Sequence, residues 1–167
     1  MCLIKDPEIA RTLYGRAQSV ISWKDFREQQ PELAAFGEAR LTRAPAYLAT
    51  VRASGAPRVH PVTPIISPLG LFVFMEPDSP KGRDLEERRW FALHSAVPDN
   101  AGTGGEFSVT GQGFEVDDAD LWSEVADAAS YTPADRYILF ELQASEARCH
   151  GYGDVLLPAT RKWPSGL

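Results

Sequence analysis

Short runs of alternating or continuous hydrophobic residues fill the chain beyond residue 46, and turn-forming residues separate them. Runs of this length and period are typical of β-strands. Most are joined by hairpin-length turns, whereas a parallel sheet would need a helix between each pair of strands. The pattern therefore predicts a mainly β fold, an antiparallel barrel with flanking helices. The predicted strands are residues 47–52, 58–63, 71–75, 90–97, 106–116 and 136–142, with a further extended segment at 144–152.

Helical patterns occur before the first strand and between the last two. Ser22 and Asp25 have the spacing of a capping box, so a helix should begin just after Ser22. Pro31 either breaks that helix or starts a second one. Residues 7–14 have a weaker helical pattern. The acidic residues 117–120 predict another helix start, because carboxylates are favoured in the first turn.

A third kind of helix start follows the apolar strand 71–75. Ser79 suits an N-cap and Pro80 suits the first helical position. Free backbone N–H groups and the positive end of the helix dipole then favour an anion there. Lys81 and Arg83 would add two cations, and Arg58 could join them from the neighbouring strand. An ordinary solvated, charged helix explains the same residues, and the residue types alone favour this interpretation because Ser-Pro helix starts are common.

Proline and glycine mark irregular places in the predicted sheet. Four prolines occur between residues 57 and 68. Proline cannot donate to a strand ladder, so the strand 58–63 should lie at an edge or carry a bulge. Gly111 and Gly113 interrupt the strand 106–116. They predict a bulge, or a place where another group approaches the backbone closely.

Length and composition describe an ordinary soluble protein. The 167 residues suit one domain, with 44% hydrophobic and 24% charged residues. We expect residues 1–40 to form a helical segment that packs on a barrel of residues 41–167. A net charge of −6 argues against nucleic acid as a partner. No apolar run approaches the roughly 20 residues that span a bilayer, and we expect a cytoplasmic protein without a membrane partner.

The sequence carries no motif for metal binding or nucleophilic catalysis. His60, His94 and His150 lack the spacing of a metal site. Cys2 and Cys149 offer no paired zinc-ligand spacing and are expected to be free thiols. No serine lies in a nucleophile elbow. An apolar sheet beside the helix start at Ser79 would instead suit an aromatic ligand that carries a phosphate.

Residues 47–62, which span two strands and their turn, resemble the opening hairpin of the pyridoxamine 5′-phosphate oxidase-like, FMN-binding split-barrel family. Residues 79–85, Ser-Pro-Lys-Gly-Arg-Asp-Leu, resemble the segment that holds the flavin phosphate there. The resemblance continues through residues 90–94 and 111–113. In total it covers roughly residues 36–163.

The resemblance implies a six-stranded split β-barrel and a homodimer with FMN in clefts at the dimer interface. It assigns the phosphate to Ser79, Lys81 and Arg83, and places a C-terminal tryptophan over the flavin ring. It assigns no catalytic side chain. The cofactor-binding residues carried over by position are Arg58, Val59, His60, Pro61, Ser79, Lys81, Arg83, His94, Gly111 and Trp163.

The expected function is that of an FMN-dependent oxidoreductase acting on a small molecule, because the flavin itself carries the electrons. The oxidase's Arg-x-His substrate-phosphate motif has no clear counterpart; residues 161–163 read Arg-Lys-Trp instead. Pyridoxine phosphate is therefore not the expected substrate. The family also contains proteins that use a deazaflavin or haem. A non-catalytic flavin- or haem-binding or sensing protein, and a dimer that has lost its ligand, remain the alternatives.

Overall fold

The computed structural model describes residues 19–152 and 160–164. The expected helix 7–14 and Cys2 lie outside these residues. The helices are α2 (Trp23–Gln29), α3 (Pro31–Leu41), α4 (Pro80–Arg88) and α5 (Ala119–Ala128). The strands are β1 (Ala46–Val51), β2 (Pro57–Val62), β3 (Ile65–Ser67), β4 (Gly70–Met75), β5 (Trp90–His94), β6 (Glu106–Glu115), β7 (Ile138–His150) and β8 (Thr160–Trp163).

All six predicted strands are present, but the described residues form eight. The extended segment at 144–152 is not separate, because it continues the sixth predicted strand as the 13-residue β7. The two additional strands are β3 and β8. β3 has only three residues, too few to show a period. β8 contains Arg161 and Lys162 and pairs with β7 at the sheet margin, where a strand needs no continuous apolar run.

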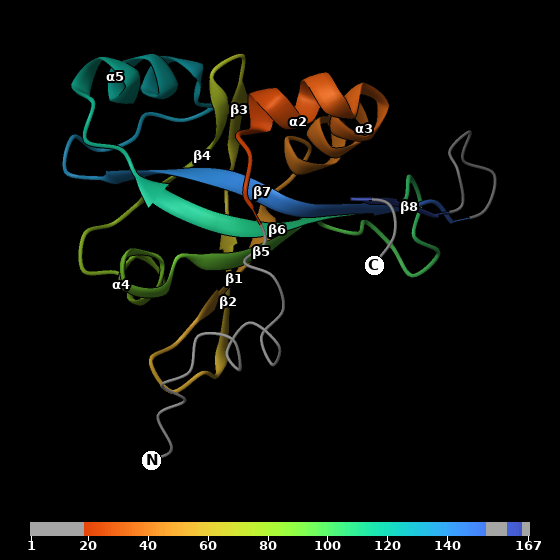
Figure 1. Ribbon diagram of the computed structural model, residues 1–167, viewed down its shortest axis with the longest axis horizontal. Coiled ribbons are helices and arrows are strands. Elements are labelled where there is room, and N and C mark those ends of the chain that lie inside the picture. Colours follow the sequence, from red (N-terminus) through yellow and green to blue (C-terminus); the bar gives the residue numbers. More distant parts are fainter. Residues whose placement is uncertain (1–18, 153–159, 165–167) are drawn as a thin grey trace.

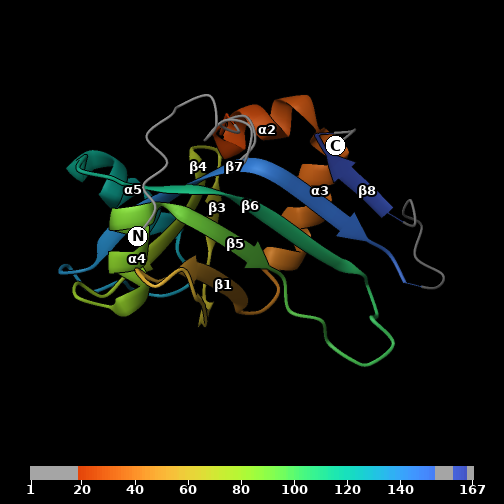
Figure 2. The ribbon, with the colours of Figure 1, turned by 60° about the horizontal axis from the view of Figure 1, so that its bottom comes forward.

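The strands form one antiparallel sheet that curls into a half-barrel. The path of neighbours is β2-β1-β5-β6-β7-β4-β3, and β8 pairs with β7 beside it. β2 and β3 lie at opposite ends of this path, yet only Thr63 and Pro64 separate them in the chain. The sheet must therefore curl until its two ends approach (Figures 1 and 2). β2 lies at the edge, as its prolines predicted.

The predicted irregularity at Gly111 is a β-bulge between β6 and β7. Thr110 pairs with Glu146 and Gly111 with Ala144, so Ser145 has no opposite partner. The Ser145 hydroxyl instead donates to the Thr110 carbonyl oxygen at 3.2 Å. Two buried residues consequently follow one another in β7, and the sheet bends there.

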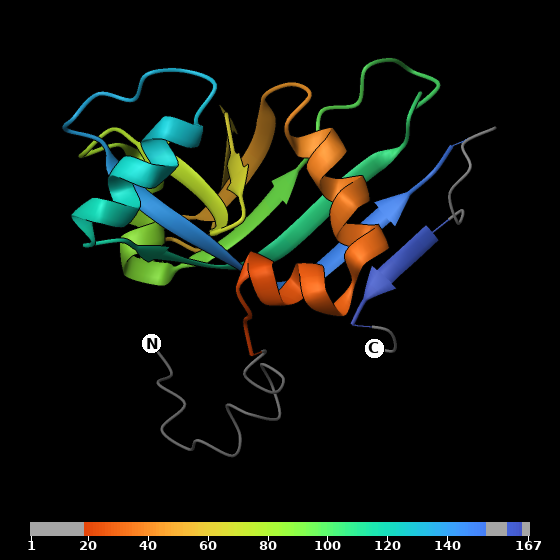
Figure 3. The ribbon, with the colours of Figure 1, turned by 90° about the horizontal axis from the view of Figure 1, so that it is seen from above.

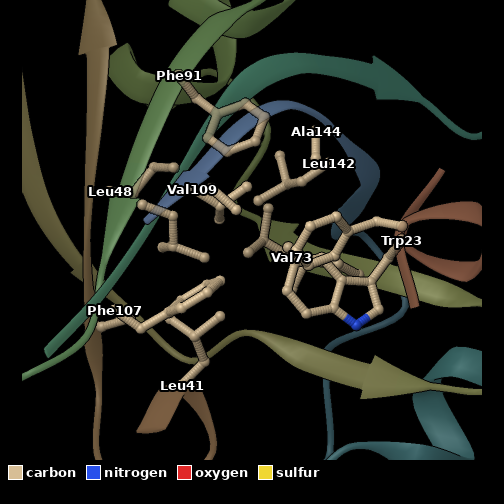
Figure 4. Close-up of a cluster of buried hydrophobic side chains, with 14 of the residues drawn as sticks. Trp23, Leu41, Leu48, Val73, Phe91, Phe107, Val109, Leu142 and Ala144 are labelled. Carbon is tan, nitrogen blue, oxygen red and sulfur yellow. The ribbon is translucent and has the colours of Figure 1, made fainter. Parts of the chain in front are cut away.

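Helices α2 and α3 cover the concave face of the half-barrel (Figure 3). Ser22 caps α2 by accepting from the Asp25 N–H at 3.1 Å, and Pro31 begins α3 instead of breaking a longer helix. Trp23, fully buried, packs at 6.1 Å between ring centroids against Phe107 of β6. Figure 4 shows strand and helix side chains meeting in this core. Its labelled members include Leu41, Leu48, Val73, Phe91, Val109, Leu142 and Ala144.

A smaller apolar cluster lies between α5 and the β3–β4 end of the sheet. Val125 of α5 is fully buried and belongs to the same cluster as Phe74 of β4. Trp122 packs edge-on against Phe74 at 5.0 Å. Asp118 caps α5 by accepting from the N–H groups of Asp120 and Leu121, which confirms the helix start predicted from the acidic run.

Candidate functional site

The start of α4 has the capping arrangement predicted from its sequence. The Ser79 Oγ accepts from the Gly82 N–H at 3.2 Å, and Pro80 occupies the first helical turn. Gly82 is buried, and a methyl group on it would lie 2.9 Å from the Ser79 Oγ. The cap thus already satisfies one backbone donor of the helix. Any anion at this end would meet the remaining donors and the neighbouring cations.

The two cations of this helix have different surroundings. Arg83 is exposed, and its Nε and Nη2 donate to the Asp78 carbonyl oxygen at 3.2 and 2.7 Å. Lys81 is half-buried, and its charge helps to lower the pKa of Glu76, which follows β4. Its ammonium group forms no ion pair with the residues that the structure describes.

A buried carboxylate joins α4 to the first two strands. Asp84 is 4% exposed. Its Oδ2 accepts from the Thr50 hydroxyl on β1 and from the Arg58 Nε on β2, both at 2.8 Å. Its Oδ1 accepts from the Arg88 Nη2 at 3.1 Å, and the Arg88 Nε also donates to the Val51 carbonyl oxygen. Two guanidinium groups thus share one carboxylate at the corner of the half-barrel.

The pKa of Asp84 follows from this network. Burial by itself would raise the pKa, because it disfavours the charged carboxylate. The hydrogen bonds from Arg58, Thr50 and Arg88 outweigh burial and lower the pKa below its ordinary value. Asp84 is therefore ionised at neutral pH and paired with Arg58 and Arg88, and Arg88 also pairs with Glu87.

The pleat of β2 divides the four residues predicted on it between two faces. Arg58 and His60 are opposite Thr50 and Leu48 and point toward the concave side. Val59 and Pro61 are opposite Ala49 and Tyr47 and point outward. Because β2 is an edge strand, a ligand at its free side could reach both sets.

The outward face of β2, β1 and β5 carries exposed apolar side chains. Val59 is 59% exposed, Tyr47 50% and Trp90 42%. Pro61 and Ala92 belong to the same face by strand register. We call these five residues the open sheet face. Exposed apolar groups clustered in this way are typical of a contact surface.

His94 lies beside the open sheet face, opposite Tyr47. Its Nδ1 is 2.7 Å from the Ser95 carbonyl oxygen. A carbonyl can only accept, so Nδ1 carries the proton. Its Nε2 lies 3.7 Å from a carboxylate oxygen of Glu106, and the side chain is 44% exposed. His94 could therefore offer Nε2 to a ligand.

The last two predicted residues are placed by contacts within the chain. Gly111 is buried and faces the backbone of β7. Trp163 packs edge-on against Phe26 of α2 at 5.1 Å and is partly buried. Five strand steps separate β8 from β2, up to about 24 Å along the sheet. Trp163 thus lies away from the corner at Arg58 within the chain.

Two large hollows lie beside α5, with volumes of about 420 and 490 Å³. Neither is lined by a predicted site residue. Among residues 19–152 and 160–164, no cluster of three or more His, Cys, Asp or Glu side chains is arranged to hold a metal ion. The helices described are also all too short or too polar to cross a membrane.

Sequence reasoning missed Asp84 and Thr50 as members of this corner. Asp84 lies inside the segment 79–85, and its spacing from Lys81 could have indicated a shared helix face. Nothing in the sequence indicates that its carboxylate is buried against Arg58, because 26 residues separate them. The structure joins Arg58 through Asp84 to α4, the helix that Ser79 caps and that carries Lys81, and places His94, Gly111 and Trp163 on other strands.

No family model and no curated protein matches the sequence of the chain. Solved structures do match its fold. HutZ, the haem storage protein of Vibrio cholerae, is 22% identical with a TM-score of 0.53, over 69% of this chain and 89% of that one. A candidate pyridoxamine 5′-phosphate oxidase of Listeria innocua is 12% identical with a TM-score of 0.56, over 72% and 97%.

A haem-binding protein of Mycobacterium smegmatis is 16% identical with a TM-score of 0.59. The match covers 77% of this chain and 57% of that one, so this chain spans little more than half of it. These likenesses confirm the predicted fold: an antiparallel, curled half-barrel of the split-barrel type with flanking helices. At such low sequence identity these matches show a shared fold and do not show a shared function.

Proposed function

We propose that this chain is an FMN-binding flavoprotein that works as a homodimer and oxidises or reduces a small molecule. The observation that carries the proposal is the position of Arg58, which lies on the edge strand β2 and is bound through Asp84 to α4, the helix whose start carries Ser79 and Lys81. A phosphate would lie at the corner, held by charge-assisted hydrogen bonds. The flavin ring would lie along the edge of β2.

The free edge of β2 supplies the polar contacts that a flavin ring needs. β2 pairs only with β1 among the described strands, so carbonyl oxygens point away from the sheet along its free edge, whereas Pro57 and Pro61 have no N–H to offer there. Apolar Val59 and Tyr47 would pack beside the ring. The bound flavin would supply the electron or hydride transfer. The chain itself binds and orients, and no side chain is assigned as acid or base.

A second copy of the chain would complete the site. In one subunit the open sheet face is exposed, and the hollows at α5 are lined by none of the predicted residues. Packing two open sheet faces together would bury Tyr47, Val59 and Trp90 and cover the flavin. It would also allow Trp163 of one subunit to approach the flavin held by the other.

Haem binding without turnover is the second candidate, and His94 is the specific observation that favours it. A histidine that donates Nδ1–H to a carbonyl and exposes Nε2 has the arrangement of an iron or zinc ligand. HutZ, which shares the fold, is described as a haem storage protein. A deazaflavin with a phosphate-bearing tail is the third candidate and would use the same corner as FMN.

One experiment separates these candidates. The purified chain is incubated with FMN, a deazaflavin or haemin in turn, desalted, and examined by absorbance and mass spectrometry. Retained FMN that NADH or NADPH reduces supports the oxidoreductase. A retained Soret band that is lost in His94→Ala supports the haem protein instead. A chain that retains none of the three contradicts all of these proposals and leaves a dimer without ligand.

A further inference from the structure

Arg58 is held by one edge of its guanidinium only. Its Nε donates to Asp84, and the side chain is 20% exposed. Its two Nη groups have no acceptor among residues 19–152 and 160–164. A guanidinium carries its five N–H donors in a rigid plane. Fixing the Nε edge therefore also fixes the direction in which the two Nη groups point.

Asp84 is in turn held from three sides. The Thr50 hydroxyl donates to the same oxygen as Arg58, and the Arg88 Nη2 donates to the other oxygen. Arg88 also donates to the Val51 carbonyl oxygen. These partners come from β1, β2 and α4. A buried carboxylate with three donors on three elements has little freedom to rotate.

From these contacts we propose that Asp84 is a positioning residue of the cofactor site: it holds the Arg58 guanidinium so that its two free Nη groups face the phosphate. This inference rests on the proposed function, because it assigns the ligand phosphate to the same corner. The inference adds Asp84 to the phosphate site. Asp84 is negatively charged, like the phosphate, so charge complementarity alone would not predict it at this site.

The charge of Asp84 makes the inference testable by the direction of an effect. If the charged residues at the corner acted only through their electrostatic potential, removing a carboxylate beside the phosphate would tighten FMN binding. If Asp84 positions Arg58, removing its charge would release the guanidinium and weaken binding. The two accounts therefore predict opposite changes in FMN affinity for Asp84→Asn. Asparagine has nearly the same shape as aspartate, so the substitution mainly removes the charge.

The experiment measures dissociation constants for FMN and for riboflavin, which lacks the phosphate, by flavin fluorescence. We expect Asp84→Asn to weaken FMN binding about tenfold or more, the loss typical of one charge-assisted hydrogen bond, and to leave riboflavin binding unchanged. Equal loss for both flavins would show a merely structural role. Unchanged or tighter FMN binding would also overturn the inference.

Two further variants complete the design. Glu87→Gln removes a carboxylate from the same helix, where Glu87 pairs with Arg88 at the surface, and should leave the FMN constant within about twofold. In an Arg58→Ala background, Asp84→Asn should cost no further FMN affinity, because its effect passes through Arg58. An additional loss in that background would contradict the positioning role.

If Asp84→Asn does not fold, Arg58→Lys decides the question, because lysine keeps the charge but lacks the guanidinium plane. We expect it to lose FMN affinity as fully as Arg58→Ala; full retention would overturn the inference. Wild-type protein that binds neither flavin would overturn the proposed function and this inference together. Wild-type protein that binds FMN while the variants match it would overturn the inference alone.

Discussion

Gly111 of β6 and Gln143 of β7 approach so closely that a Cβ atom on Gly111 would lie 1.8 Å from the Gln143 carbonyl oxygen. The obstacle is backbone, held by the bulge at Ser145, and cannot rotate away. The glycine is thus required by the sheet itself. A ligand is not needed to explain it.

Gly111→Ala is therefore expected to destabilise the fold by more than about 3 kcal/mol, at or above the usual range for overpacking. Gly113→Ala is the matched control, because its Cβ would meet only flexible Leu85 and Leu142 atoms at 3.3–3.4 Å. Urea unfolding followed by circular dichroism measures both. Similar stability of the two variants would show that β7 can shift to admit the methyl group.

Lys81 and Arg83 carry the same charge on one helix but should contribute unequally to cofactor binding. Lys81→Ala is expected to weaken FMN binding about tenfold or more, because its ammonium group forms no ion pair with the described residues and is free to bind a phosphate. Arg83→Ala should change it less than about threefold, because the guanidinium is bound to the Asp78 carbonyl oxygen and exposed. Fluorescence titration compares them. An unchanged double variant would refute the phosphate assignment.

The open sheet face should be the dimer interface. Val59→Glu places a charge at its most exposed apolar position and is expected to yield monomers with much weaker FMN binding. Leu69→Glu is the control: Leu69 is 41% exposed but lies in the turn between β3 and β4. Light scattering coupled to size-exclusion chromatography gives the masses. If the Val59→Glu variant remains dimeric and keeps full FMN affinity, the dimer interface does not include the open sheet face.

Asp84 should make stability depend on pH in the acid range. Its pKa is lower in the folded chain than the ordinary value of 3.8, so the ionised form stabilises the fold above that pH. That stabilisation is lost as the pH falls through the folded-state pKa. The network is lost at all pH values in Asp84→Asn.

Above about pH 5, we expect the free energy of unfolding of the wild type to exceed that of Asp84→Asn by about 2–3 kcal/mol. The difference is smaller than for a fully buried ion pair, because both arginines are partly exposed. The difference should shrink below about pH 4. Urea unfolding at a series of pH values measures it. A difference that stays constant to pH 3 would mean that the charge of Asp84 does not stabilise the fold.

Local patterns in the sequence were enough to predict most elements. The helix caps at Ser22 and Ser79, the helix start in the acidic run 117–120, the edge position of β2 and the irregularity at Gly111 were all predicted and are all present. Each depends on residues within a few positions of one another. The short β3 and the charged β8 were missed, because their pairing partners, not their own residues, make them strands.

The candidate site was predicted as a set of residues but not as an arrangement. Alternation along β2 could have separated Arg58 from Val59 by face, whereas the burial of Asp84 could not be read from its neighbours. Trp163 resembles a free tail residue in sequence, yet it packs on Phe26, more than 130 residues earlier.

By itself the sequence determined the element types, their caps, the edge strand and the segment at which an anion would be sought, because these follow from short-range sterics and hydrogen bonding. The tertiary structure alone decided that Arg58, Asp84 and Thr50 meet, that Arg83 binds the Asp78 carbonyl oxygen, and that an apolar sheet face stays exposed. Those outcomes depend on how a curled sheet brings distant strands and one helix to the same corner, which no local pattern encodes.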